Sequence, residues 1–184
     1  MPSSDAITIP TVMKIVRHLK PNSILDIGCG NGKYGFLFRE ALDLDYGRMQ
    51  KGLWNTVING IEVEDSYITS VHEYIYNVVF ISDWKDFEPK VTKYDIAFMG
   101  DVLEHFTDWE YALNKARAIA DTVIVVAPNW KGSIAQGAWF GNKHEAHRVE
   151  LSPGLVGGKC LFANSKCFIS VFGDERIEDK LLTY

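Results

Sequence analysis

The chain has 184 residues, of which 47% are apolar and 23% are charged, and its formal net charge is −5. These values predict one soluble globular domain, residues 1–184, with a sizeable core. No apolar run approaches the roughly 20 residues that a membrane span needs, and the acidic balance argues weakly against a nucleic-acid substrate. The start of the chain lacks a signal-peptide pattern, and three cysteines without a C-x-x-C motif fit a reducing, cytoplasmic setting.

The first part of the chain predicts a helix, a strand and a second helix. Apolar residues at helical spacing predict a leading helix over about 9–20. The apolar run 24–27 is typical of a parallel strand that is buried on both faces. From Lys33 the apolar positions return to helical spacing, at Tyr34, Leu37, Phe38 and Ala41.

A glycine-rich turn joins this strand to the second helix. Glycines stand at 28, 30 and 32, and Asp26 precedes them. Glycine adopts backbone conformations closed to other residues and lets a ligand approach the main chain. A dinucleotide fingerprint would read G-x-G-x-x-G, but here the third glycine comes one position early. The turn alone is therefore open between a nucleotide-type site and a tight strand–helix connection.

The next part of the chain predicts two more strands. The connection 43–55 is longer than a simple link and is either a decorated surface or part of a lid. The segment 56–62 predicts a strand that ends in Glu62, whose carboxylate could accept bonds from both hydroxyls of a ribose. We expect a helix over 65–75 with Tyr67, Val71, Tyr74 and Ile75 on its apolar side, then a strand over 78–81.

The second half continues the alternation and then breaks it. A fourth strand, 94–100, runs into Asp101-Val102-Leu103-Glu104-His105, and a capping box T-x-x-E at 107–110 opens a helix. A fifth strand covers 122–127. Five strands alternating with helices predict a parallel sheet. An irregular insertion follows at about 129–153, with a short helix at 152–156, and 159–172 predicts a hairpin.

Two motifs carry a family resemblance. D-I-G-C-G-N-G at 26–32 and D-V-L-E-H at 101–105 resemble the first and fourth motifs of class I S-adenosylmethionine-dependent methyltransferases of the small-molecule type. The resemblance covers a core of about 7–173. It implies an α/β fold, a three-layer αβα Rossmann-like sandwich whose mostly parallel sheet is closed by a C-terminal β-hairpin. It also implies S-adenosyl-L-methionine as cofactor and S-adenosyl-L-homocysteine as product.

The resemblance also assigns cofactor-binding residues. Glu62 would hold the ribose, Asp83 and Trp84 would lie against the adenine, and Asp101, Val102 and His105 would face the reaction centre. The full set implied is Asp26, Gly28, Cys29, Gly30, Gly32, Tyr34, Glu62, Val63, Asp83, Trp84, Gly100, Asp101, Val102 and His105.

The implied reaction moves a methyl group to an O, N or C nucleophile of a small molecule. His105 is the first candidate for a general base, because a histidine suits proton transfer near neutral pH. The insertion supplies the substrate candidates Trp130, Trp139, His144 and His147. His144 and His147 lack the H-E-x-x-H spacing and an evident third ligand, so no metal is expected.

Two other classes remain open from the sequence. One is a methyltransferase-like binding protein or subunit without catalysis. The other is an NAD-dependent oxidoreductase, which would require the missing G-x-G-x-x-G. A small molecule is the expected partner, with neither nucleic acid nor membrane, and the oligomeric state is left open.

Overall fold

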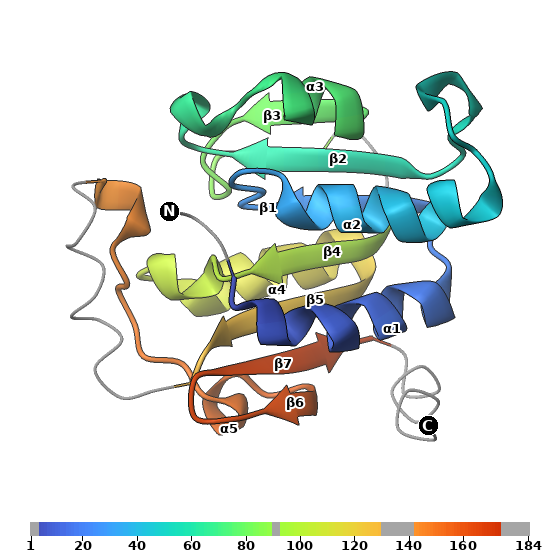
Figure 1. The fold of residues 1–184 in the computed structure, drawn as a ribbon. Helices are drawn as coiled ribbons and strands as arrows, with labels where there is room; N and C mark the ends of the chain where they lie inside the picture. Colours follow the sequence, from blue (N-terminus) through green and yellow to red (C-terminus); the bar gives the residue numbers. More distant parts are fainter. Residues whose placement is uncertain (1–3, 90–92, 130–141, 174–184) are drawn as a thin grey trace.

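A seven-stranded sheet in the order β3-β2-β1-β4-β5-β7-β6 organises the chain (Figure 1). The structure is a computed structural model that describes residues 4–89, 93–129 and 142–173. The strands are β1 Ser23–Ile27, β2 Val57–Glu62, β3 Val78–Ile81, β4 Tyr94–Gly100, β5 Ala120–Pro128, β6 Lys159–Ala163 and β7 Cys167–Phe172. Strands β1 to β5 are parallel, whereas β7 runs antiparallel to β5 and β6. The predicted sheet with its closing hairpin is confirmed.

Strand β1 stands at the point where the strand order reverses. Its Asp26 lies opposite Gly60 of β2 on one side and opposite Phe98 of β4 on the other. The connections that follow β1 and β4 therefore diverge and leave a crevice at the carboxyl ends of these strands. Open α/β sheets bind their ligands at such a point.

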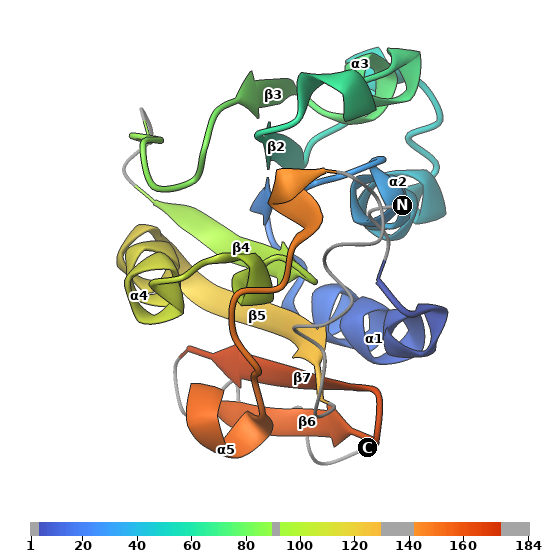
Figure 2. The same ribbon diagram turned by 90° about the vertical axis from the view of Figure 1, so that its left-hand side faces the viewer.

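Helices cover both faces of the sheet, which gives three layers (Figure 2). The helices are α1 Ile9–Leu19, α2 Lys33–Leu42, α3 Ser70–Ile75, α4 Trp109–Ile119 and α5 Pro153–Val156. Helices α1, α2 and α3 contribute to one core cluster, and α4 and α5 to the other. Alternate strand residues face the two clusters: Ile24 packs into the first and Leu25 into the second. The central strands β1, β4 and β5 are buried on both faces, which explains their continuous apolar runs, whereas the edge strand β3 is partly exposed.

Two local predictions were wrong. The expected helix over 65–75 is a 3₁₀ turn, Asp65–Tyr67, followed by the short helix α3. Val71 and Tyr74 were expected on the buried side, but they are 49% and 55% exposed. Their places are taken by His72 and by Tyr76, just after the helix, which face the glycine turn and find polar partners there.

The second wrong prediction concerns the start of α4. Its N-cap is Asp108, whose side chain accepts from the Tyr111 N–H at 3.1 Å, rather than Thr107 of the expected capping box. Aspartate is among the strongest N-cap residues. Moving the cap from Thr107 to Asp108 therefore still provides an acceptor for the unpaired backbone N–H groups of the first turn.

The long connection 43–55 is a surface feature at the amino end of the sheet. It contains the 3₁₀ turns Leu44–Tyr46 and Lys51–Leu53. The buried guanidinium of Arg39 joins it to the body by donating to the Asp43 carboxylate and to the Thr56 and Ile75 carbonyls. None of its residues borders the large cavity of the described chain, so the lid interpretation is not supported. Within the described ranges, no helix is long and apolar enough to cross a bilayer.

Candidate functional site

A cavity of about 960 Å³ opens at the carboxyl ends of β1, β2, β4 and β5. This is the upper end of the usual range of small-molecule sites, roughly 300–1,000 Å³. The residues of the sequence-derived site that line it are Asp26, Gly28, Cys29, Gly30, Tyr34, Glu62, Val63, Asp83, Trp84, Gly100, Asp101, Val102, His105, His144 and His147. Gly32 is not among the lining residues, and Trp130 and Trp139 lie outside the described residues.

The glycine turn requires glycine for two separate reasons. Gly28, Gly30 and Gly32 have φ of +70°, +52° and +80°, a region that strongly favours glycine. In addition, a Cβ on Gly28 would lie 2.5 Å from Val102 Cγ2. The turn therefore lies directly against the segment that follows β4, and the two sequence motifs meet in space.

Two residues that the sequence analysis missed support this turn. The Gly30 carbonyl accepts from His72 Nε2 at 2.8 Å, and His72 Nδ1 accepts from the Thr69 N–H at 3.1 Å. The Tyr76 hydroxyl donates to Asp26 Oδ2 at 2.7 Å. A histidine and a tyrosine spaced i, i+4 would share one face of a helix, and this was the available signal.

Asp26 is buried beside the turn, with 2% of its surface exposed. Burial raises the pKa of its carboxyl group to about 7; the Tyr76 hydroxyl opposes this rise, and the nearby Glu62 carboxylate adds to it. Its Oδ2 accepts from the Tyr76 hydroxyl, so the side chain is held in place where it borders the cavity.

Glu62 ends β2 and holds the turn in place. Its Oε2 accepts from the Gly30 N–H at 2.8 Å, and its Oε1 accepts from the N–H groups of Val63 and Glu64 at 2.9 and 3.0 Å. These bonds use three of the roughly four acceptor positions of a carboxylate. A ribose bound through two hydroxyls would have to displace one of them, and Oε2, with a single partner, offers more room.

Asp83 and Trp84 border the cavity after β3 in different ways. Asp83 is partly exposed, and its carboxylate accepts from the Lys85 N–H at 3.0 Å. The Trp84 ring is only 3% exposed, and its Nε1 donates to the Ala112 carbonyl at 3.0 Å. The ring is therefore a core side chain, which leaves only its backbone for a ligand.

The segment after β4 holds one partly buried carboxylate, Asp101, and one fully buried carboxylate, Glu104. Asp101 has φ +48°, an uncommon conformation for a residue other than glycine, and such strain concentrates at functional sites. Burial raises the Asp101 pKa to about 6, although Ser4 and Lys33 oppose the rise. Glu104 is 1% exposed, and neither of its carboxylate oxygens has a hydrogen-bond partner among the described residues.

A strap, defined here as residues 142–149, crosses the carboxyl ends of the strands (Figure 2). On the β2 side, Asn142 Nδ2 donates to Glu64 Oε2 at 3.2 Å and the Tyr67 hydroxyl donates to Glu145 at 2.9 Å. On the β4 side, the Arg148 N–H donates to the Glu104 carbonyl at 2.8 Å. The strap places His144 and His147 at the cavity.

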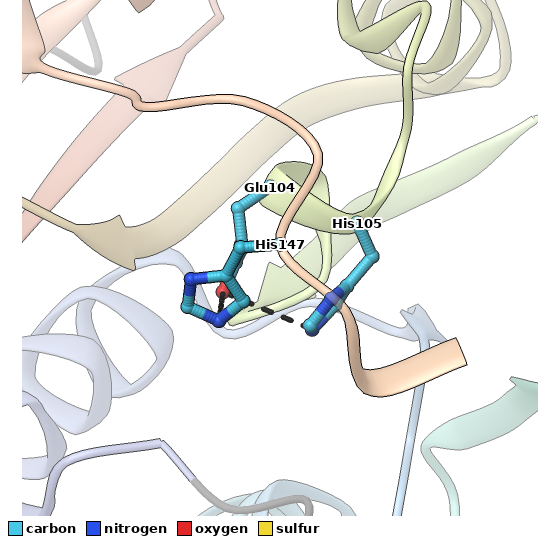
Figure 3. A group of neighbouring side chains, drawn as sticks. All are labelled: Glu104, His105 and His147. Atoms are coloured by element: carbon cyan, nitrogen blue, oxygen red, sulfur yellow. Dashed lines mark ion pairs between the residues drawn. The ribbon is translucent and has the colours of Figure 1, made fainter. Parts of the chain in front are cut away.

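His105, which follows β4, and His147 of the strap come together at the cavity. Their ring centroids are 5.1 Å apart, and both rings lie next to Glu104 (Figure 3). The Nδ1 of His105 lies 3.2 Å from the Ala146 carbonyl, which can only accept, so Nδ1 carries the proton and Nε2 presents its lone pair. Burial lowers the His105 pKa, which keeps the ring neutral near pH 7.

Comparison with known proteins gives matches of structure only. No protein-family model matches the sequence, and no curated protein matches it. Among solved structures, the PH0226 protein from Pyrococcus horikoshii OT3 is similar with a TM-score of 0.60 and 17% identity, over 90% of this chain and 87% of that one. The N-terminal domain of EvdMO1, in the presence of SAH and D-fucose, is similar with a TM-score of 0.57 and 15% identity, over 88% and 80%.

A third similar structure is the plantazolicin methyltransferase BpumL in complex with a triazolic desmethylPZN analog and SAH. It has a TM-score of 0.50 and 19% identity over 76% of this chain, which spans only 54% of the length of that enzyme. At these identities the similarity establishes the fold, which is that of class I methyltransferases. The predicted Rossmann-like architecture is thereby confirmed.

Proposed function

We propose that the protein is an S-adenosylmethionine-dependent methyltransferase that acts on a nucleophile of a small molecule. The observation that carries the proposal is the glycine turn at positive φ, which lies beside the Glu62 carboxylate on the wall of one large cavity. The fold supports it, because similar structures contain S-adenosylhomocysteine.

The residues present fit this cofactor. The bare backbone of the turn allows a ligand to lie against it, and the Glu62 Oε2 can take a hydroxyl proton in a charge-assisted bond. The Asp83 carboxylate can accept from an exocyclic amine. When bound, the cofactor supplies a methyl group on a positively charged sulfonium, whose departure leaves a neutral thioether.

The chain itself then has to position an acceptor and manage its proton. Proximity and alignment contribute most of the rate in such a transfer, and the strap closes the cavity over the β4 side where an acceptor would lie. The neutral His105, with its Nε2 lone pair available, stays the predicted general base. His144 and His147 stay the predicted substrate contacts.

Calorimetric titration of the purified protein with S-adenosylmethionine, S-adenosylhomocysteine and NAD tests the proposal. We expect one-to-one binding of the first two and none of NAD. Glu62→Gln should weaken S-adenosylhomocysteine binding by about tenfold or more, since a charge-assisted bond worth roughly 1.5–3 kcal/mol is lost.

The control is Asp65→Asn, which changes an exposed acid in the loop just after β2 that does not line the cavity. Its affinity should match that of the wild type. Binding of NAD alone, or an unchanged affinity in Glu62→Gln, would overturn the assignment. Glu62→Ala is a poorer test, because it strands three backbone donors and would lower the melting temperature.

A further inference from the structure

We propose that Glu104, His105 and His147 form a binding site for a divalent transition-metal ion. The proposal deepens the proposed function and rests on it, because the site opens on the same cavity. The three residues come from two segments, the D-V-L-E-H stretch and the strap, that lie far apart in the sequence and meet at one point (Figure 3).

The geometry of the three ligand atoms fits one ion. Glu104 Oε1 lies 4.0 Å from His105 Nε2 and 3.9 Å from His147 Nε2. These separations are too long for hydrogen bonds, but two metal–ligand bonds of roughly 2.1 Å each can bridge them. All three atoms lie within 4.8 Å of one another, so a small rotation of one imidazole completes the set.

The Glu104 carboxylate is the independent sign that something binds here. It is 1% exposed, and both its oxygens lack a hydrogen-bond partner within the described ranges. A buried polar group without a hydrogen-bond partner costs about 1–3 kcal/mol of stability, and a charged group costs more. Buried charges in proteins are paired or bind metals, and Glu104 has no cation at hydrogen-bond distance in the described part of the chain.

The surroundings are arranged as around a metal ligand. The Nδ1 of His105 faces the Ala146 carbonyl at 3.2 Å, which fixes the ring and directs Nε2 toward Glu104. Metal-binding histidines nearly always hold their second nitrogen in this way. The neighbours of His147 are also fixed, because the N–H groups of Arg148 and Val149 both donate to the Glu104 carbonyl, at 2.8 and 3.3 Å.

The ligand types indicate the class of ion and its use. Two imidazoles and one carboxylate suit Zn²⁺, Fe²⁺ or Mn²⁺ better than Ca²⁺ or Mg²⁺. All three residues line the cavity, so an ion would keep at least one coordination position facing it. An oxygen of the methyl acceptor can take that position.

This assignment replaces the role of His105 as a general base. One lone pair cannot both ligate an ion and accept a proton. It also revises the expectation of no metal, which considered His144 and His147 together. The fold pairs His147 with Glu104 and His105 instead.

The test is a Co²⁺ titration of the full chain after treatment with a chelator, followed by visible absorption and calorimetry. We expect one ion per chain and the absorption bands of a nitrogen- and oxygen-ligated site. Glu104→Gln and His147→Asn should each weaken Co²⁺ binding by about tenfold or more. His144→Asn is the matched control, since His144 lines the same cavity outside the cluster, and its Co²⁺ affinity should be unchanged.

Melting temperatures show whether each variant is still folded. Without metal, Glu104→Gln should melt close to the wild-type temperature, because the Glu104 carboxyl group has no hydrogen-bond partner among the described residues to lose. Co²⁺ should stabilise only the wild type and His144→Asn. No Co²⁺ binding to the wild type, or equal binding to Glu104→Gln, would overturn the site. S-adenosylhomocysteine titrated in parallel separates the two proposals. If the protein binds S-adenosylhomocysteine but not Co²⁺, only the metal site is overturned. If it binds Co²⁺ but not S-adenosylhomocysteine, only the methyltransferase assignment is overturned.

Discussion

The two ends of the sheet treat buried charge in opposite ways. At the amino end, Arg39 is 2% exposed and donates to two carbonyls and to the buried Asp43 carboxylate, which Arg48 also binds. At the carboxyl end, Glu104 is equally buried and Asp101 is partly buried, yet three of their four carboxylate oxygens have no hydrogen-bond partner in the described chain. Paired charges at one end hold the fold together, and carboxyl oxygens without a partner at the other end border the cavity where we propose that a ligand binds.

The largest effect is expected from breaking the satisfied end. Arg39→Met removes the cation from a buried pair and leaves Asp43 and two carbonyls without it, so the free energy of unfolding should fall by about 3–5 kcal/mol. Chemical denaturation measures this. The control is Arg17→Met, because Arg17 and its partner Asp45 have side chains 51% and 47% exposed, and such pairs contribute only about 0–1 kcal/mol. Equal losses in both variants would show that the Arg39 network does not stabilise the fold.

A smaller effect is expected from adding a single methyl group to one glycine at each end of the sheet. Gly28→Ala combines a positive φ with a clash against Val102 and should destabilise by about 2–4 kcal/mol, together with a loss of S-adenosylhomocysteine affinity. Gly47→Ala has a similar φ, +77°, but meets no atom of the described residues within 4 Å. It should cost only about 1–2 kcal/mol and leave affinity intact. Similar losses in stability and affinity would mean that strain alone explains the requirement for glycine.

The last effect, which is the smallest only when it is counted for each pH unit, concerns Asp26. Its carboxyl pKa is about 7 in the folded chain and near 3.8 when unfolded, so the folded state holds one more proton between these values. This group therefore stabilises the fold at low pH and loses that contribution as pH rises toward 7, by at most about 1.4 kcal/mol per pH unit. Asp26→Asn should flatten the dependence of stability on pH from 4 to 7, measured by urea denaturation. An unchanged slope would contradict the raised pKa.

The fold was predictable because its signals are local. Runs such as 24–27 and 94–100 carry the strand pattern in consecutive residues. The glycine turn and D-V-L-E-H are each recognisable from a few consecutive residues. The helix at 65–75 was misjudged for the opposite reason. His72 and Tyr76 are buried by polar contacts with Gly30 and Asp26, which no periodicity of apolar residues can show.

The candidate site was predictable only in part for a related reason. Glu104 stands inside a motif that the sequence analysis used, but nothing nearby in the sequence reveals that its carboxylate is buried without a partner. The sequence analysis considered His147 together with the nearby His144, whereas the strap places His147 beside Glu104 and His105. Contacts between distant segments decide chemistry that spacing along the chain cannot express.

The strap also makes the two halves of the cavity thermodynamically interdependent. One of its ends is bonded to Glu64, two residues beyond Glu62, and the other to the backbone of Glu104. We therefore expect a ligand that moves Glu64 to change the alignment of His147. Because linkage is reciprocal, an ion at Glu104 should alter the affinity for S-adenosylhomocysteine by the same factor by which S-adenosylhomocysteine alters the affinity for the ion.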